Sequence, residues 1–235
     1  MLSYRKLAMR VLGRPLHTGG NDSPRPASQR AAAFILTAAM LTTFTAPAFA
    51  GTWYIEDGDI TISAGESGNN VTQNENTTEN DPDTIITNRE DKASSNTVTI
   101  DANGKNDKVE VTLKDVNIDT SSRNKAAVSV TGEGDTNIKL NGDNALKSDI
   151  YRSGIYGSGS GSLTISGGEN DSLTAQGGSG ANGISSSGSL TISGGTVTAN
   201  GDDGGHGIYS RGGVTISGGS TVTAKGESGT ISGGD

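Results

Sequence analysis

Two tyrosines with neighbouring arginines are the side chains of this sequence best suited to hold a ligand. Tyr156 and Tyr209 occupy equivalent positions in repeated segments, and Ser185 occupies the same position between them. Tyrosine rings along one face suit stacking on sugar rings, because the ring is apolar with a polar end. Arg152 and Arg211 lie close to these tyrosines in the sequence, and a guanidinium binds a uronate carboxylate through paired hydrogen bonds. The pattern predicts a sugar-binding face; the alternative is exposed tyrosines beside turns and arginines in surface ion pairs.

Acidic side chains form a second kind of candidate site. Asp202 and Asp203 are adjacent, and Glu227 follows in the next repeat. Carboxylate oxygens are the ligands that calcium prefers, so this set is a candidate calcium site. Neither an EF-hand nor a glycine-rich calcium nonapeptide is present, and solvated turn residues are the alternative interpretation. A second cluster of the same kind comprises Glu79, Asp81 and Asp83.

These candidates lie on a repeat of nearly fixed period. A Thr-Ile-Ser-Gly-Gly motif recurs within residues 162–168, 189–195 and 213–219, so the copies are 27 and 24 residues apart. The spacing of 27 continues backwards through Ile138 to Val111. A period of this size indicates a solenoid in which each repeat is one structural unit.

Each repeat offers three short strands separated by turn residues, without helical periodicity. Successive side chains of a strand point to opposite faces, so Leu163 and Ile165 share one face and Thr164 takes the other. Stacked coils bury such residues in one apolar ladder. The sequence therefore predicts an all-β, right-handed parallel β-helix with about 24–27 residues per coil. The other expected inward columns are Ile155, Ile184 and Ile208, and Leu173, Val197 and Val222.

The segments before the repeats have different predicted roles. Residues 1–50 contain six basic residues, an apolar run over 31–46 and a small-x-small site at 48–50, which predict a secretory signal peptide. Residues 51–96 are expected to form an N-terminal cap strand, with Trp53 covering the core, and then a polar loop over 64–96 that holds a short strand near residues 84–87. The β-helix is expected over 97–235 and stops within a repeat, which suggests a longer parent protein.

Charge and cysteine content narrow the class of protein. Removal of residues 1–50 takes away six basic residues and one acidic residue, which leaves 12 Lys and Arg against 25 Asp and Glu, a net charge of −13. Nucleic-acid affinity depends on Lys and Arg, so nucleic acid is not an expected partner. The sequence has no cysteine, and its stability must come from the stacked core and not from disulfides.

Several stretches resemble a family of bacterial carbohydrate-binding parallel β-helix domains, whose members include cellulose- and polygalacturonate-binding proteins and repeat regions of gut-bacterial surface adhesins. The resemblance covers roughly residues 97–235. It implies a right-handed β-helix, export, binding of cellulose or an acidic polysaccharide, and calcium. The stretches that carry it are 111–119 (VTLKDVNID), 126–130 (AAVSV), 134–148 (GDTNIKLNGDNALKS) and the SLTISGG repeats.

Three classes of function remain open from the sequence. The first is a secreted or cell-surface, non-catalytic polysaccharide-binding or adhesin-like module, attached to a membrane only through an anchor outside this sequence. The second is a polysaccharide lyase or hydrolase of pectin-lyase-like fold, although no catalytic residue is predicted and fold analogy alone does not establish an activity. The third is a structural or ice-binding solenoid, because Thr196 and Thr198 align with Thr221 and Thr223 in a threonine ladder.

Overall fold

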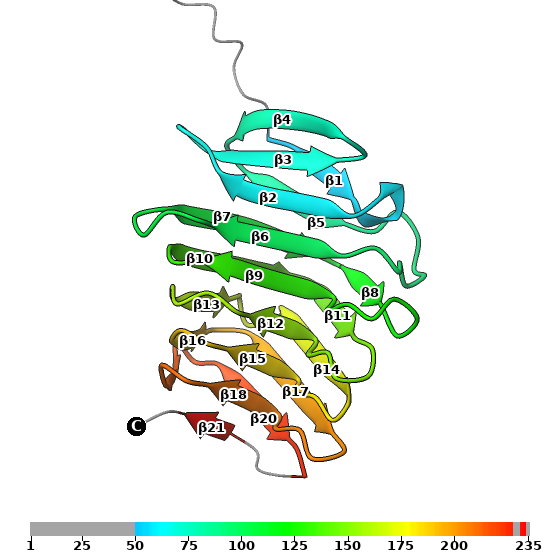
Figure 1. The fold of residues 1–235 in the computed structure, drawn as a ribbon, viewed down its shortest axis with the longest axis vertical. Coiled ribbons are helices and arrows are strands. Elements are labelled where there is room, and N and C mark those ends of the chain that lie inside the picture. The colour runs from blue at the N-terminus through cyan, green and yellow to red at the C-terminus, as the bar shows by residue number, and fades with distance from the viewer. Residues whose placement is uncertain (1–49, 228–230, 234–235) are drawn as a thin grey trace, which may run out of the picture. The chain divides into compact units, whose positions relative to one another are not determined.

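The computed structural model describes residues 50–227 and 231–233, so the predicted signal peptide lies outside the described residues apart from its last position. The described chain is a β-solenoid in which parallel sheets are built from successive coils (Figure 1). Its only helical element is the 3-10 turn η1 (Ile55–Asp57). No described helix has the length and apolar character that a membrane crossing requires. The predicted parallel β-solenoid is confirmed.

Three sheets run along the solenoid. From residue 108 onward each coil contributes one strand to each sheet in the order A, C, B, whereas the preceding residues contribute no strand to sheet C. Sheet A contains β1 (Thr52–Tyr54), β5 (Thr84–Thr87), β7 (Lys108–Lys114), β10 (Asp135–Asn141), β13 (Leu163–Ser166), β16 (Leu190–Ser193) and β19 (Val214–Ser217). Sheet C contains β8 (Asn117–Asp119), β11 (Asp143–Lys147), β14 (Ser172–Ser179), β17 (Thr196–Asp202) and β20 (Thr221–Lys225). Sheet B contains β4 (Asn76–Asp81), β3 (Asn69–Gln73), β2 (Ile60–Ala64), β6 (Val98–Ala102), β9 (Val128–Gly132), β12 (Ile155–Gly157), β15 (Ile184–Ser186), β18 (Ile208–Ser210) and β21 (Ile231–Gly233).

The strand register reproduces the period found in the sequence. Val111 pairs with Ile138, Ile138 with Ile165, and Ile165 with Ile192, each 27 residues further along the chain. The next step, to Ile216, is shorter, because Leu190 and Val214 are only 24 residues apart in the same register. The coils therefore stack residue on residue, and the irregular lengths are absorbed in the turns.

The core is the apolar ladder that this stacking produces. All three predicted inward columns point inward, and their members are fully buried as far as Ile208 and Val197. Ile216 belongs to the same ladder but is 45% exposed, because β19 pairs on one side only within the described residues. Burying such side chains contributes roughly 1.5–3 kcal/mol each, which explains why a chain with no disulfide holds this shape.

The N-terminal end of the solenoid is closed by an antiparallel meander of β2, β3 and β4 (Figure 1). The prediction of a polar loop over 64–96 is wrong for the residues of β3 and β4. The predicted short strand at residues 84–87 is confirmed as β5. The hydropathy pattern missed β3 because two of its inward positions hold amides. Asn69 donates to Thr84 Oγ1 at 2.9 Å and Gln73 donates to the Tyr54 carbonyl at 2.8 Å. These amides satisfy polar groups at the end of the core.

Three strands in the C-terminal half of sheet B are short and present little outward surface. Its strands β12, β15 and β18 have three residues each, and the first and third of these point into the core. Each of these strands therefore presents one outward side chain.

Candidate functional site

The outward side chains of sheet B stand in one column along the solenoid. Thr99 pairs with Ser129, Ser129 with Tyr156, Tyr156 with Ser185, and Ser185 with Tyr209. The predicted alignment of Tyr156, Ser185 and Tyr209 is confirmed. Adjacent strands are about 4.8 Å apart, so the two tyrosines are separated by about 10 Å along the axis.

A groove runs beside this column, and we call it the sheet B groove. Its other wall is formed by the turns that lead from sheet C into sheet B. It consists of two adjoining hollows of about 320 Å³ and 230 Å³, and both are lined by Arg152 and Tyr156. The first hollow is also lined by Thr97, Thr99, Asn124, Lys125, Ala126 and Ser129. The second is also lined by Tyr151, Ser153, Gly180, Ala181, Asn182 and Ser185.

Arg152 is the cation at the centre of the groove. Its Nε donates to Asn124 Oδ1 at 3.1 Å, and its backbone N–H donates to the Asp149 carbonyl at 2.9 Å. No acidic side chain in the described part of the chain forms an ion pair with its guanidinium. The side chain is exposed, so a guanidinium held through Nε keeps its two terminal nitrogens for a ligand.

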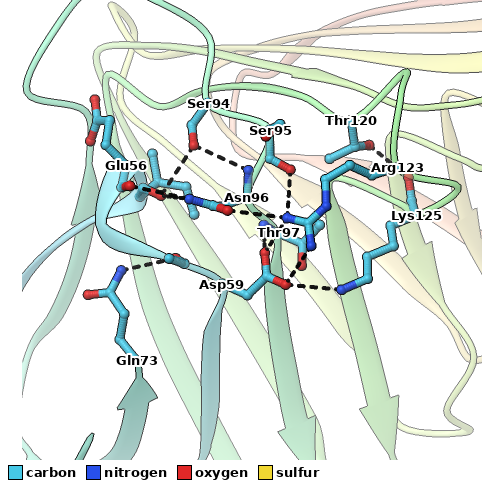
Figure 2. A network of polar contacts seen from close by, with 12 residues as sticks. Glu56, Asp59, Gln73, Ser94, Ser95, Asn96, Thr97, Thr120, Arg123 and Lys125 are labelled. Carbon is cyan, nitrogen blue, oxygen red and sulfur yellow. Dashed lines mark hydrogen bonds and ion pairs between the residues drawn. The ribbon is translucent and has the colours of Figure 1, made fainter. Parts of the chain in front are cut away.

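Lys125, the other cation of the groove, has a carboxylate partner within the protein, which it shares with Arg123. Its Nζ lies 3.0 Å from Asp59 Oδ2, and Arg123 binds the same carboxylate through two hydrogen bonds of 2.8 and 3.1 Å. Figure 2 shows this network, in which the Thr97 backbone N–H also donates to Asp59. Partial burial by itself raises the pKa of Asp59, but the hydrogen bonds from Arg123, Thr97 and Lys125 outweigh it and lower that pKa to about 2. The network joins the N-terminal segment to two later turns.

The aromatic groups of the site differ in exposure. Tyr156 is 45% exposed, whereas Tyr209 is half-buried and stacks on His206 with ring centroids 5.7 Å apart and an interplanar angle of 21°. The small Ser185 between them is 9% exposed. Along the column, the small side chain of Ser185 therefore lies between the rings of Tyr156 and Tyr209.

Tyr151 is part of the groove, and the sequence analysis missed it. It is 76% exposed, and its ring lies against Gly180, where an added methyl group would approach a ring carbon to 2.7 Å. Its φ is +59°, a left-handed conformation that is uncommon for a bulky residue. The available signal was a tyrosine directly before Arg152 in a turn, where small and polar residues are usual.

Arg211 is not part of the groove. It was predicted to act with Arg152, but it lies in the turn from sheet B to sheet A, whereas Arg152 lies in the turn from sheet C to sheet B. Parallel strands place these turns at opposite ends, so the two arginines lie at opposite edges of the sheet. Closeness in sequence to a tyrosine did not determine which end of a three-residue strand each arginine occupies.

The described structure does not bring the acidic residues predicted as calcium ligands together in a group of three. Within residues 50–227 and 231–233, no group of three or more His, Cys, Asp or Glu side chains is arranged to hold a metal ion. This applies to Asp202, Asp203 and Glu227, and Asp203 instead accepts a hydrogen bond from the Ser179 hydroxyl.

Of the second acidic cluster, Glu79, Asp81 and Asp83, only Asp81 is buried, and it has a structural role. Its carboxylate accepts hydrogen bonds from the Gly51 backbone at 2.8 Å, from Trp53 Nε1 at 2.9 Å and from the Thr84 hydroxyl at 3.1 Å. These contacts fasten the first strand to the N-terminal meander.

Comparison with family models, with curated proteins and with solved structures finds no match for this chain.

Proposed function

We propose that this protein is a non-catalytic polysaccharide-binding module that works outside the cell or at its surface, and that the sheet B groove holds the polysaccharide. The observation that carries the proposal is the pairing of an exposed tyrosine ring with an uncompensated arginine in one groove. Tyr156 and Arg152 line both hollows. An aromatic ring binds the apolar face of a sugar, and a guanidinium binds a carboxylate.

The remaining lining of the groove fits the same class of ligand. It is made of hydroxyl and amide side chains, among them Thr99, Ser129, Asn124 and Asn182. Such groups donate to and accept from sugar hydroxyls. Because Arg152 is the cation of the groove that has no carboxylate partner among the described residues, we propose an acidic polysaccharide of the polygalacturonate class ahead of neutral cellulose. The predicted signal peptide and the resemblance to exported carbohydrate-binding domains support the location.

The test is retention of the purified protein on immobilised polygalacturonate and on insoluble cellulose, with released reducing and unsaturated ends measured in the same samples. We expect retention on polygalacturonate without sugar release. Sugar release would make the protein an enzyme, and failure to bind either polysaccharide would overturn the proposal. Runs with calcium and with a chelator show whether a cation takes part in binding.

Two variants locate the site in the same assay. Arg152→Ala is expected to lose retention on polygalacturonate. Arg211→Ala is the matched control, since it removes the same charge at the opposite edge of sheet B, and it is expected to bind as the unaltered protein does. Equal losses for the two variants would show that net charge, and not the groove, governs retention.

A further inference from the structure

We infer that the polysaccharide lies along the solenoid axis, crosses about five strands, and is held by its interior sugars and not by a chain end. This inference rests on the proposed function and specifies in which direction the polysaccharide lies and which of its sugars are bound. Its starting point is the shape of sheet B. Strands β12, β15 and β18 each present one outward side chain, so this part of sheet B has no row of outward side chains in the direction of its strands.

The aligned row of outward side chains in the described part of sheet B runs across the strands. It passes from Thr99 on β6 through Ser129, Tyr156 and Ser185 to Tyr209 on β18. Four strand spacings of about 4.8 Å make this row about 19 Å long. A glycan that places one sugar at each of the five aligned positions, from Thr99 to Tyr209, fills the row with five sugars.

The two hollows of the groove follow the same direction. The first is lined by residues of β6, β9 and β12, and the second reaches from Tyr156 on β12 to Ser185 on β15. Arg152 borders both, so a carboxylate at the middle of the bound chain meets its guanidinium. The ring of Tyr151 lies over Gly180 of the next coil and forms the outer wall of the second hollow.

The row has no bulky residue to stop a chain at its N-terminal end. Beyond Thr99 the same column continues with Thr61 on β2, Thr72 on β3 and Thr77 on β4. These side chains are smaller than a tyrosine and carry hydroxyl groups. A polysaccharide can therefore pass beyond the groove in this direction, and no chain end is required on this side.

The experiment is calorimetric titration of the protein with galacturonan oligomers from the disaccharide to the octasaccharide, and with a hexasaccharide whose reducing end has been reduced. Affinity is expected to rise with length, to level off at about five sugars, and to be the same for the reduced and unreduced hexasaccharide. Constant affinity from the disaccharide onward would overturn the axial arrangement while leaving the proposed function standing. Failure of all the oligomers and of the polymer to bind would overturn both.

Two substitutions use residues that the column already carries. Tyr209→Ser installs the residue found at positions 129 and 185, and it is expected to lower affinity for the hexasaccharide about tenfold and for the trisaccharide much less. Ser129→Tyr adds a ring to the row and is expected to raise affinity for the hexasaccharide, whereas Thr164→Tyr, on the outward face of sheet A, is the matched control with no effect. A hexasaccharide affinity that is unchanged in both Tyr209→Ser and Ser129→Tyr would overturn the axial row.

Discussion

Two tyrosine–arginine pairs in the described part of this solenoid differ in whether the arginine is paired with a carboxylate. Beside sheet A, Arg89 lies over the Tyr54 ring, with its guanidinium carbon 4.0 Å from the ring centroid. The same guanidinium forms a two-pronged ion pair with Asp57, whose pKa is lowered chiefly by this hydrogen bonding. Beside sheet B, Tyr156 and Arg152 line an open groove, and Arg152 has an amide partner in place of a carboxylate.

The difference teaches that residue types alone do not make a binding site. Arg89 already has Asp57 as its carboxylate partner and lies over the Tyr54 ring, so a ligand that binds this guanidinium would have to displace Asp57. Arg152 is oriented by Asn124 but not neutralised. In a chain whose residues 51–235 carry a net charge of −13, Arg152 keeps its guanidinium free of carboxylates beside the 45% exposed ring of Tyr156, whereas Arg89 is paired with Asp57.

Replacing Arg152 should weaken polysaccharide binding, whereas replacing Arg89 should lower only the stability of the fold. The loss of affinity in the Arg152 variant is the largest effect we expect. Hydrogen bonds to charged groups contribute about 1.5–3 kcal/mol, so Arg152→Ala should lower affinity for polygalacturonate about ten- to a hundredfold. Arg89→Ala should leave that affinity unchanged and lower the melting temperature. Titration calorimetry and thermal unfolding of both variants measure this, and equal affinity losses would contradict the comparison.

Replacing Tyr151 should separate binding from stability. A bulky residue at positive φ costs about 1–3 kcal/mol, and glycine adopts this conformation freely. Tyr151→Gly is therefore expected to raise the melting temperature by about 2–4 °C, the shift that about 1 kcal/mol produces in a protein of this size. It should also lower polysaccharide affinity several-fold. Tyr156→Ser is the control that should weaken binding without raising the melting temperature; a destabilised Tyr151→Gly variant would show that the ring serves packing.

Supplying Arg152 with a carboxylate should make the groove resemble the Arg89 site. Asn124 tolerates this change, because its own φ of +51° suits aspartate as well as asparagine. An exposed ion pair is worth about 0.2–1 kcal/mol, so Asn124→Asp should weaken binding of polygalacturonate by up to about fivefold. Binding of a neutral glycan should not change. Asn182→Asp, on the same wall but without a bond to Arg152, is the comparison variant.

Acid should weaken the ion-pair network in which Arg123 and Lys125 share the carboxylate of Asp59. The pKa of Asp59 is about 2 in the folded protein against 3.8 for the ordinary group. Because the folded value is the lower one, this stabilisation is fully present above about pH 4 and is lost as the pH falls toward 2. The effect is small, since the Asp59 side chain is 37% exposed. Urea unfolding between pH 5 and pH 2 should show a shallower loss of stability for Asp59→Asn, and parallel curves would contradict this role.

Much of the fold could be predicted from the sequence, because the strands obey a local rule. Alternation placed Ile165, Ile184 and Val197 inward, and the period of 27 set the register that the structure has. The N-terminal meander could not be predicted in the same way. Its inward Asn69 and Gln73 look like loop residues until the carbonyl and hydroxyl groups they bind are known, and those lie 15 to 41 residues away.

The candidate site, like the fold, could be predicted from the sequence only in part. The sequence by itself determined that Tyr156 and Tyr209 share a column, because equivalent positions of a regular repeat must stack. Only the tertiary structure decided that Arg152 and Tyr151 border the groove and that Arg211 lies at the opposite edge of sheet B. It also decided that Asp59 forms an ion pair with Lys125. These relations depend on how turns of unequal length return the chain to the next strand, and on contacts between coils that no local pattern encodes.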